Sequence, residues 1–146
     1  MPCFYKDFNN GIKLFLKELI RNFPHVGALS AFLTAFKLLK LINKKLPHKW
    51  FQDLVNIPYG SYIAVKDDSF FTSPDFKTYP LYQHFIPLLR ETWCGCDVAN
   101  KDAIWSHLQF VITLNQKIIN YRVAKKLPPI ENLSIEVIEN EPTEDD

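Results

Sequence analysis

The chain has 146 residues, 47% of them hydrophobic and 23% charged, with a formal net charge of +1. This length fits a single domain and excludes a barrel enzyme with a separate cofactor domain. Only four glycines are present, which leaves little material for a glycine-rich phosphate loop.

The small net charge conceals an asymmetry along the chain. Residues 1–50 carry a net charge of +7, residues 51–129 carry +1, and residues 130–146 carry −7. Opposite charges attract over roughly 8–10 Å at physiological salt, so the acidic tail could compete for the surface of the basic segment. The simpler interpretation is a solvated tail that aids solubility.

Three cysteines make a poor disulfide framework and favour a reducing compartment. The chain shows neither a signal-peptide pattern nor an apolar run of the roughly 20 residues that span a bilayer. We therefore expect a soluble intracellular protein without a transmembrane segment.

The first half of the chain predicts helices. Apolar residues recur at helical spacing over residues 11–23 and again over residues 25–46. The second of these segments is apolar over much of its circumference, which is typical of a helix packed on two sides. A short third helix is expected over residues 48–56 after Pro47. Residues 57–60 predict a turn and residues 61–65 a short strand.

The second half predicts a helix over residues 81–93, interrupted at Pro87, and a long helix over residues 100–126 capped by Asn100. Alternating residues over 133–138 predict an edge strand beside residues 61–65, and disorder is expected beyond Glu139.

These elements define a mainly α fold. It is a single-domain bundle of four to five helices over residues 1–129, with a short two-stranded β element and an acidic C-terminal tail over residues 130–146. Alternating βα units are absent, which argues against a parallel-sheet nucleotide enzyme.

The tetrapeptide Trp93-Cys94-Gly95-Cys96 is similar to the thioredoxin active site with one residue missing. A thioredoxin-type thiol lies at a helix N-terminus, whereas this tetrapeptide follows a predicted helix. Gly95 is better interpreted as the cap of that helix.

Other candidate chemistry is weak. Asp67, Asp68 and Asp75 are better read as a solvated turn than as a cation site. None of the histidines has a usual zinc spacing, although Cys94, Cys96 and a histidine could still meet in space. We assign no catalytic residue, no metal site and no cofactor. The histidines are His25, His48, His84 and His107.

Lysines recur on the polar faces of the first two predicted helices. If these faces adjoin, they form a basic patch that can bind phosphates or an acidic protein. Lysine far outnumbers arginine, and base readout favours arginine, so nucleic-acid binding would be non-specific. Ordinary solvated lysines are the alternative. The patch comprises Lys13, Lys17, Arg21, Lys37, Lys40, Lys44, Lys45 and Lys49.

Aromatic residues make up 14% of the chain and are dense between residues 57 and 82. Aromatic side chains are enriched at the buried centres of protein interfaces, so this segment is a candidate partner-binding surface. The predicted surface comprises Tyr59, Tyr62, Phe70, Phe71, Phe76, Tyr79 and Tyr82.

Residues 12–24 (IKLFLKELIRNFP) and 100–109 (NKDAIWSHLQ) resemble segments of small helical proteins from large DNA viruses of eukaryotes. In those proteins a long helix similarly carries an Ile-Trp-x-x-Leu-Gln core. The resemblance implies a viral protein that is made in an infected cell, but it implies no reaction.

We therefore expect a non-catalytic viral protein that acts through protein–protein contacts, as a minor virion component or a host-directed adaptor in the host cytoplasm or nucleus. One alternative is a nucleic-acid-associated protein whose basic helices compete with the acidic tail. The other is a small metal- or thiol-dependent protein. The sequence leaves homo-oligomer formation open.

Overall fold

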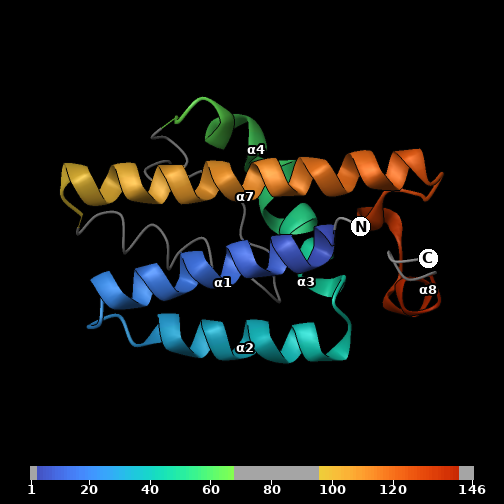
Figure 1. Cartoon of the computed structure of the whole chain (residues 1–146). Coiled ribbons are helices and arrows are strands. Elements are labelled where there is room, and N and C mark those ends of the chain that lie inside the picture. The colour runs from blue at the N-terminus through green and yellow to red at the C-terminus, as the bar shows by residue number, and fades with distance from the viewer. Residues whose placement is uncertain (1–2, 68–95, 142–146) are drawn as a thin grey trace.

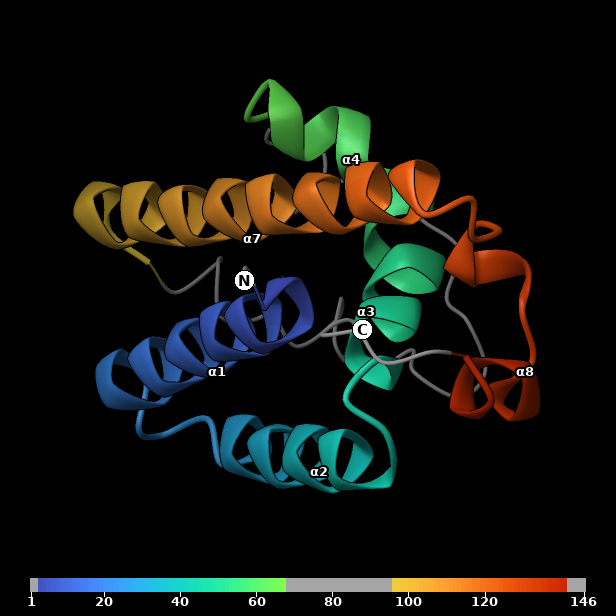
Figure 2. The same cartoon turned by 45° about the vertical axis from the view of Figure 1, so that its right-hand side comes forward.

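The computed structural model describes residues 3–67 and 96–141, and these ranges are mainly helical and contain no β-strand (Figure 1). The three longest helices are α1 (Phe4–Asn22), α2 (Ala28–Ile42) and α7 (Val98–Ala124). Helix α1 lies between α2 and α7 and runs antiparallel to both (Figures 1 and 2). The predicted mainly α fold is confirmed.

Helix α1 begins seven residues before its predicted start at Gly11. Glycine weakens a helix interior, yet here it serves the packing of two helices. A Cβ atom at Gly11 would lie 2.7 Å from Cδ1 of Leu114 on α7. The missing side chain therefore lets α1 and α7 approach closely, and the helix continues through Gly11 to bury Tyr5 and Phe8.

Residues 46–64 are helical throughout. Helix α3 (Leu46–Phe51) continues through a π-helical turn η1 (Gln52–Asn56) into α4 (Ile57–Ala64). The π turn ends at Asn56, two residues before Pro58, which has no N–H to continue the regular hydrogen-bond pattern. The turn predicted over residues 57–60 and the strand predicted over residues 61–65 are therefore wrong. Tyr59 and Ile63, four residues apart, are buried on one face of α4, which packs against α7.

Helix α7 confirms the long helix predicted over residues 100–126, but its cap lies earlier. Asp97 is the N-cap, and its Oδ1 accepts a 2.8 Å hydrogen bond from the backbone N–H of Asn100. Asn100 thus lies inside the first turn. The helix predicted over residues 81–93 lies outside the described residues.

Residues 130–139 of the acidic segment form two short helical turns instead of the predicted strand. They are η2 (Ile130–Asn132) and α8 (Ile135–Glu139). The chain turns back from the end of α7 so that η2 packs against α3, and α8 follows (Figure 2). Ser134 caps α8 by accepting a 3.3 Å hydrogen bond from Val137 N, and Ile138 is buried. Disorder was predicted beyond Glu139. The described chain continues through Glu141, whose side chain is buried.

Candidate functional site

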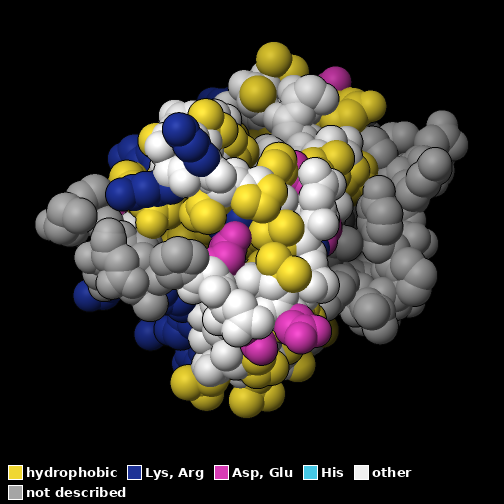
Figure 3. Space-filling view, turned by 90° about the vertical axis from the view of Figure 1, so that its right-hand side faces the viewer, with side chains coloured by type: hydrophobic (Ala, Val, Ile, Leu, Met, Phe, Trp, Pro, Cys, Tyr) yellow, Lys and Arg dark blue, Asp and Glu magenta, His cyan; other side chains and the backbone are white. Residues whose placement is uncertain are grey.

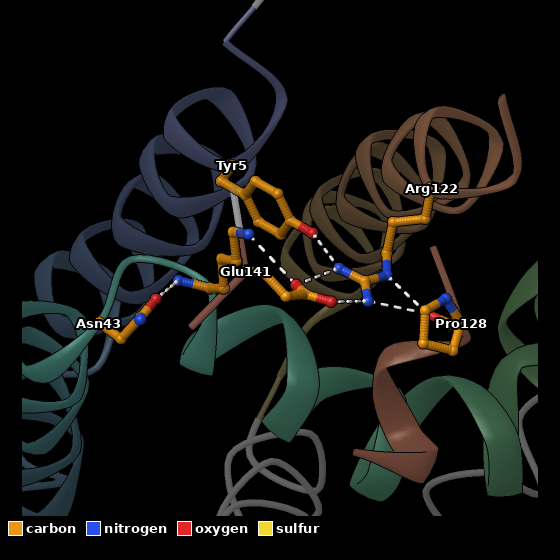
Figure 4. A network of polar contacts seen from close by, with 6 residues as sticks. Tyr5, Asn43, Arg122, Pro128 and Glu141 are labelled. Atoms are coloured by element: carbon orange, nitrogen blue, oxygen red, sulfur yellow. Dashed lines mark hydrogen bonds and ion pairs between the residues drawn. The ribbon is translucent and has the colours of Figure 1, made fainter. Parts of the chain in front are cut away.

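A buried polar network joins the end of α7 to the acidic segment (Figure 4). The Arg122 guanidinium donates from Nη1 to Tyr5 and to Glu141, from Nη2 to Glu141 and to the Pro128 carbonyl, and from Nε to the same carbonyl, over 2.7–3.0 Å. Because a guanidinium has five N–H donors, every donor of Arg122 is in use. Arg122 is therefore a structural group with no donor left for a ligand.

The turn after α7 builds this arrangement. Lys126 adopts a left-handed backbone conformation with φ 58°, and Leu127 N donates to the Arg122 carbonyl over 2.8 Å. The chain therefore folds back, and the Pro128 carbonyl meets the side chain of Arg122. Glu141 approaches the same guanidinium after α8.

Lys45 is the second cation of the network. Its Nζ lies 3.2 Å from Glu141 Oε1, and the side chains of Lys45 and Glu141 are each only 6% exposed. Its ammonium also lies 5.6 Å from the centre of the Tyr5 ring. Arg122, Lys45 and Glu141 together carry one excess positive charge. The interior position of Lys45 corrects its assignment to the surface basic patch.

The ionisation of the network follows from burial and from these contacts. Burial raises the pKa of Tyr5 to about 12, and the hydrogen bond from Arg122 opposes this shift. Burial alone would raise the pKa of Glu141, but hydrogen bonds from Arg122 and Lys45 outweigh it and hold that pKa below its ordinary value. Tyr5 is thus neutral and Glu141 ionised at neutral pH.

A pocket of about 160 Å³ lies next to this network. Its walls come from α3, η1, the end of α7 and the segment that follows α7. Apolar side chains form most of the lining, including Ile119, Leu127 and Ile130, and Glu131 and Arg122 contribute polar groups. The pocket has the size of a small organic molecule rather than of a cofactor.

His48 lines this pocket and is fully buried. Neither ring nitrogen has a hydrogen-bond partner among the described residues. The imidazole packs edge-on against Phe8 and Tyr5, with ring centres 5.4 and 5.8 Å away. Burial lowers the pKa of His48 to about 3, and the nearby amide of Asn115 opposes the shift without a hydrogen bond of ordinary geometry. The ring is therefore neutral at physiological pH.

Helix α2 presents an apolar face to solvent. Leu38, Leu41 and Ile42 are 58%, 79% and 65% exposed. They are neighbours on one helix surface because they are spaced three and four residues apart. The opposite face buries Leu29 and Phe36. Among the described residues, α2 packs against α1 and α3 and lies at the edge of the bundle, with this face left exposed (Figures 1 and 2).

The predicted aromatic surface is only partly described. Tyr59 is a core residue with 3% exposure, which corrects its assignment to a partner-binding surface. Tyr62 is half-buried and packs against the core. The other predicted members lie outside the described residues, namely Phe70, Phe71, Phe76, Tyr79 and Tyr82.

The predicted basic residues do not form one free surface. Lys17, Arg21 and Lys37 are exposed, and Arg21 pairs with Glu18 over 2.8 Å. Lys49 contacts Asp53 over 3.2 Å and two backbone carbonyls. The remaining members, apart from the buried Lys45, are half-buried: Lys13, Lys40 and Lys44.

Charge is nevertheless unevenly distributed on the face drawn in Figure 3. Figure 3 shows Lys and Arg side chains gathered along one edge of the face drawn, with the acidic side chains away from that edge. Four acids of the tail are described, namely Glu131, Glu136, Glu139 and Glu141. Of these, Glu141 contacts Lys45 and Arg122 in the interior. The predicted competition between tail and surface lysines therefore does not involve Glu141.

The weaker candidates find no support in the described ranges. These contain no cluster of three or more His, Cys, Asp or Glu side chains that could hold a metal ion. Cys96 is half-buried, while Cys94, Gly95, Asp68 and Asp75 lie outside residues 3–67 and 96–141. Asp67 lies exposed at the end of the described segment.

Sequence reasoning missed the groups that define the network and the pocket. Arg122, Glu141 and His48 have no local signal, because their contacts connect distant parts of the chain. The sequence did indicate the exposed apolar face of α2, through the excess of leucine and isoleucine in that helix.

Comparisons with known proteins add no assignment. In residues 3–67 and 96–141, no helix is long and apolar enough to cross a membrane. No protein-family model, curated protein or solved structure matches the chain, so its function must be inferred from its own residues.

Proposed function

We propose that the chain is a non-catalytic protein that acts through protein–protein contacts, and that the outer face of α2 binds an amphipathic helix with acidic flanks. The observation that supports this proposal is the joint exposure of Leu38, Leu41 and Ile42. Single exposed apolar residues are common, but a contiguous apolar helix face is typical of an interaction site. The exposed apolar face of one helix can pack against the apolar face of a partner helix.

The charge of α2 favours acidic flanks on the partner. Helix α2 contains no acidic residue, and its charged side chains are Lys37 and Lys40. Lys37 is exposed and lies one turn from Leu41, so it borders the apolar face. A second copy of the same face would bring like charges together, which disfavours self-association. Glutamates beside the apolar stripe of a partner would instead be attracted.

The resemblance to small helical proteins of large DNA viruses suggests the setting of this role. We include in the proposal that the partner is a virion or host protein met inside an infected cell. The chain would then be a minor virion component or an adaptor.

The experiment measures binding of two designed helical peptides to the whole chain by fluorescence anisotropy. Both peptides carry the same leucine stripe, with glutamate flanks in one and lysine flanks in the other. We expect the glutamate peptide to bind at least about 10-fold more tightly, and Leu41→Glu to weaken it by about 10-fold or more. Val98→Glu is the matched control, since Val98 is 76% exposed on another helix.

Equal binding of the two peptides, or an unchanged affinity in Leu41→Glu, would overturn the proposal. Sedimentation of the wild-type chain provides a further check. A dimer that Leu41→Glu converts to a monomer would assign the α2 face to a second copy of the chain instead.

A further inference from the structure

Five lysines on helices α1 and α2 form no ion pair with another described residue. Three of them are exposed and two are half-buried. Lysine can bury its aliphatic stem while its ammonium group stays in water, so half-burial leaves these charges available to a ligand. The exposed three are Lys6, Lys17 and Lys37, and the half-buried two are Lys13 and Lys40.

The register of the two helices brings these lysines together. The side-chain amide of Asn9 on α1 donates a 2.9 Å hydrogen bond to the carbonyl oxygen of Lys44, just after the end of α2. Lys13 lies one turn after Asn9, and Lys40 lies one turn before Lys44. Because α1 and α2 are antiparallel neighbours, this register places Lys13 beside Lys40 across their junction (Figure 2).

The other three lysines extend this pair along both helices. Lys6 and Lys17 lie seven residues before and four residues after Lys13, which keeps all three on one side of α1. Lys37 precedes Lys40 by three residues and lies on the same side of α2. The two rows form one basic surface along the α1–α2 junction, which we call the lysine face.

Acidic and aromatic side chains occupy the other sides of these helices. Glu18 of α1 faces α7, where it lines a small cavity together with His107. Asp7 lies three turns before Glu18 and therefore on the same side of α1. Helix α2 has no acidic residue, and its other flank carries Phe32, whose ring centre lies 5.4 Å from that of Trp50 on α3. The lysine face thus has no carboxylate among the described residues.

A row of unpaired ammonium groups fits a polyanion with closely spaced charges. A nucleic-acid duplex carries one phosphate per about 1.7 Å of its axis, so each lysine can meet a phosphate without exact spacing. Reading base edges favours arginine, and the one arginine of these helices, Arg21, pairs with Glu18. Single strands need aromatic side chains on which bases stack, but the aromatic residues of α1 and α2 all pack in or against the core.

We propose that the lysine face binds the phosphate backbone of a nucleic-acid duplex without sequence preference. This inference is independent of the apolar face of α2, because it rests on charges along the α1–α2 junction.

The test measures binding of a labelled DNA duplex of about 20 base pairs to the whole chain by fluorescence anisotropy, between about 50 and 200 mM salt. With up to five lysines on phosphates, the logarithm of the association constant should fall against that of the salt concentration with a slope of about −3 to −4.5. The affinity should therefore drop by roughly 100-fold over this range.

Two variants locate the binding on the lysine face. Lys17→Gln should make the slope shallower by about 1, and the combined replacement Lys13→Gln and Lys17→Gln by about 2. Lys66→Gln is the matched control, because Lys66 is an exposed lysine after α4, on the side of α7 away from α1 (Figures 1 and 2). The control should keep the wild-type slope.

Absence of duplex binding at about 50 mM salt would overturn the proposal. So would a slope that the combined replacement leaves unchanged, or one that Lys66→Gln reduces as much as Lys17→Gln does. Vesicles of phosphatidylserine and phosphatidylcholine in equal parts test the competing ligand. Tighter binding to these vesicles than to the duplex, lost in Leu41→Ala, would assign the surface to an anionic membrane. Leu41→Ala removes no charge and should leave duplex binding intact, so this proposal and that for the α2 face fail separately.

Discussion

Replacing Glu141 by glutamine tests whether the buried network holds the fold together. The variant keeps the shape of the side chain but removes its charge, which leaves the buried cations Arg122 and Lys45 without their carboxylate. Removing one partner of a buried ion pair typically costs about 3–5 kcal/mol. For a chain of this size that loss corresponds to a decrease of roughly 6–20 °C in melting temperature.

The assay is denaturant unfolding of wild type and variant at pH 7, followed by far-UV circular dichroism. Glu139→Gln is the matched control, because Glu139 is an exposed acid two residues away. The control should unfold at the wild-type midpoint. If Glu141→Gln also unfolds at that midpoint, the reasoning about the buried network is refuted.

Two further measurements isolate the charge effect. In a Lys45→Met background one of the two cations is absent, so Glu141→Gln should cost less stability than it does in the wild type.

The pH dependence of stability has a defined sign, because the contacts of Glu141 hold its folded pKa below the ordinary value of 4.5. Its stabilisation is present above that value and is lost as the pH falls through the folded pKa. The difference between wild type and Glu141→Gln should therefore shrink below about pH 4.5.

Three further predictions concern separate parts of the fold. The pKa of His48 in the folded chain is about 3, against an ordinary value of 6.5. The wild type should therefore lose stability relative to His48→Phe as the pH falls below 6.5, by up to about 1.4 kcal/mol per pH unit. Parallel curves of stability against pH for the two proteins would contradict the burial of a neutral ring. Gly11→Val should destabilise the chain by about 1–3 kcal/mol in thermal unfolding, because the new side chain meets Leu114 on α7. Asp97→Ala should cost about 1 kcal/mol through loss of the helix cap. Asn100→Ala should cost less, since Asn100 contributes its backbone N–H to the cap; the reverse order would restore Asn100 as the cap.

The parts of the fold that local periodicity determines were predictable. The apolar spacing over residues 11–23 identified the buried face of α1, including Phe15 and Leu19. The long last helix was equally predictable, and Leu108 and Ile118 are buried on it. In these long helices apolar residues recur on one face over several turns, so their spacing has a single interpretation.

Short segments were harder because few residues carry their pattern. Residues 133–138 alternate as in a strand, yet the Ser134 cap and the burial of Ile138 select a helical turn. Residues 61–65 are rich in residues that favour strands, and α4 forms because Tyr59 and Ile63 together reach the core. Tertiary packing decides such segments, and local propensity does not.

The candidate sites were less predictable than the fold. Lys45 follows Lys44 in the sequence and carries the same charge, yet it is buried, where it contacts Glu141 and the Tyr5 ring. No spacing rule connects these positions. The same holds for His48, whose surroundings come from α1, α3 and α7.

The long sequence separation within the network has a consequence for synthesis of the protein. Glu141 is made 96 residues after Lys45 and 19 residues after Arg122. At a translation rate of about 5–20 residues per second, Lys45 waits roughly 5–20 s for this carboxylate. An ammonium must stay hydrated during that interval, since burying it early is costly. We therefore expect the start of α3 to reach its final position, and the aromatic core around Tyr5 and Phe8 to close, only after Glu141 has been synthesised.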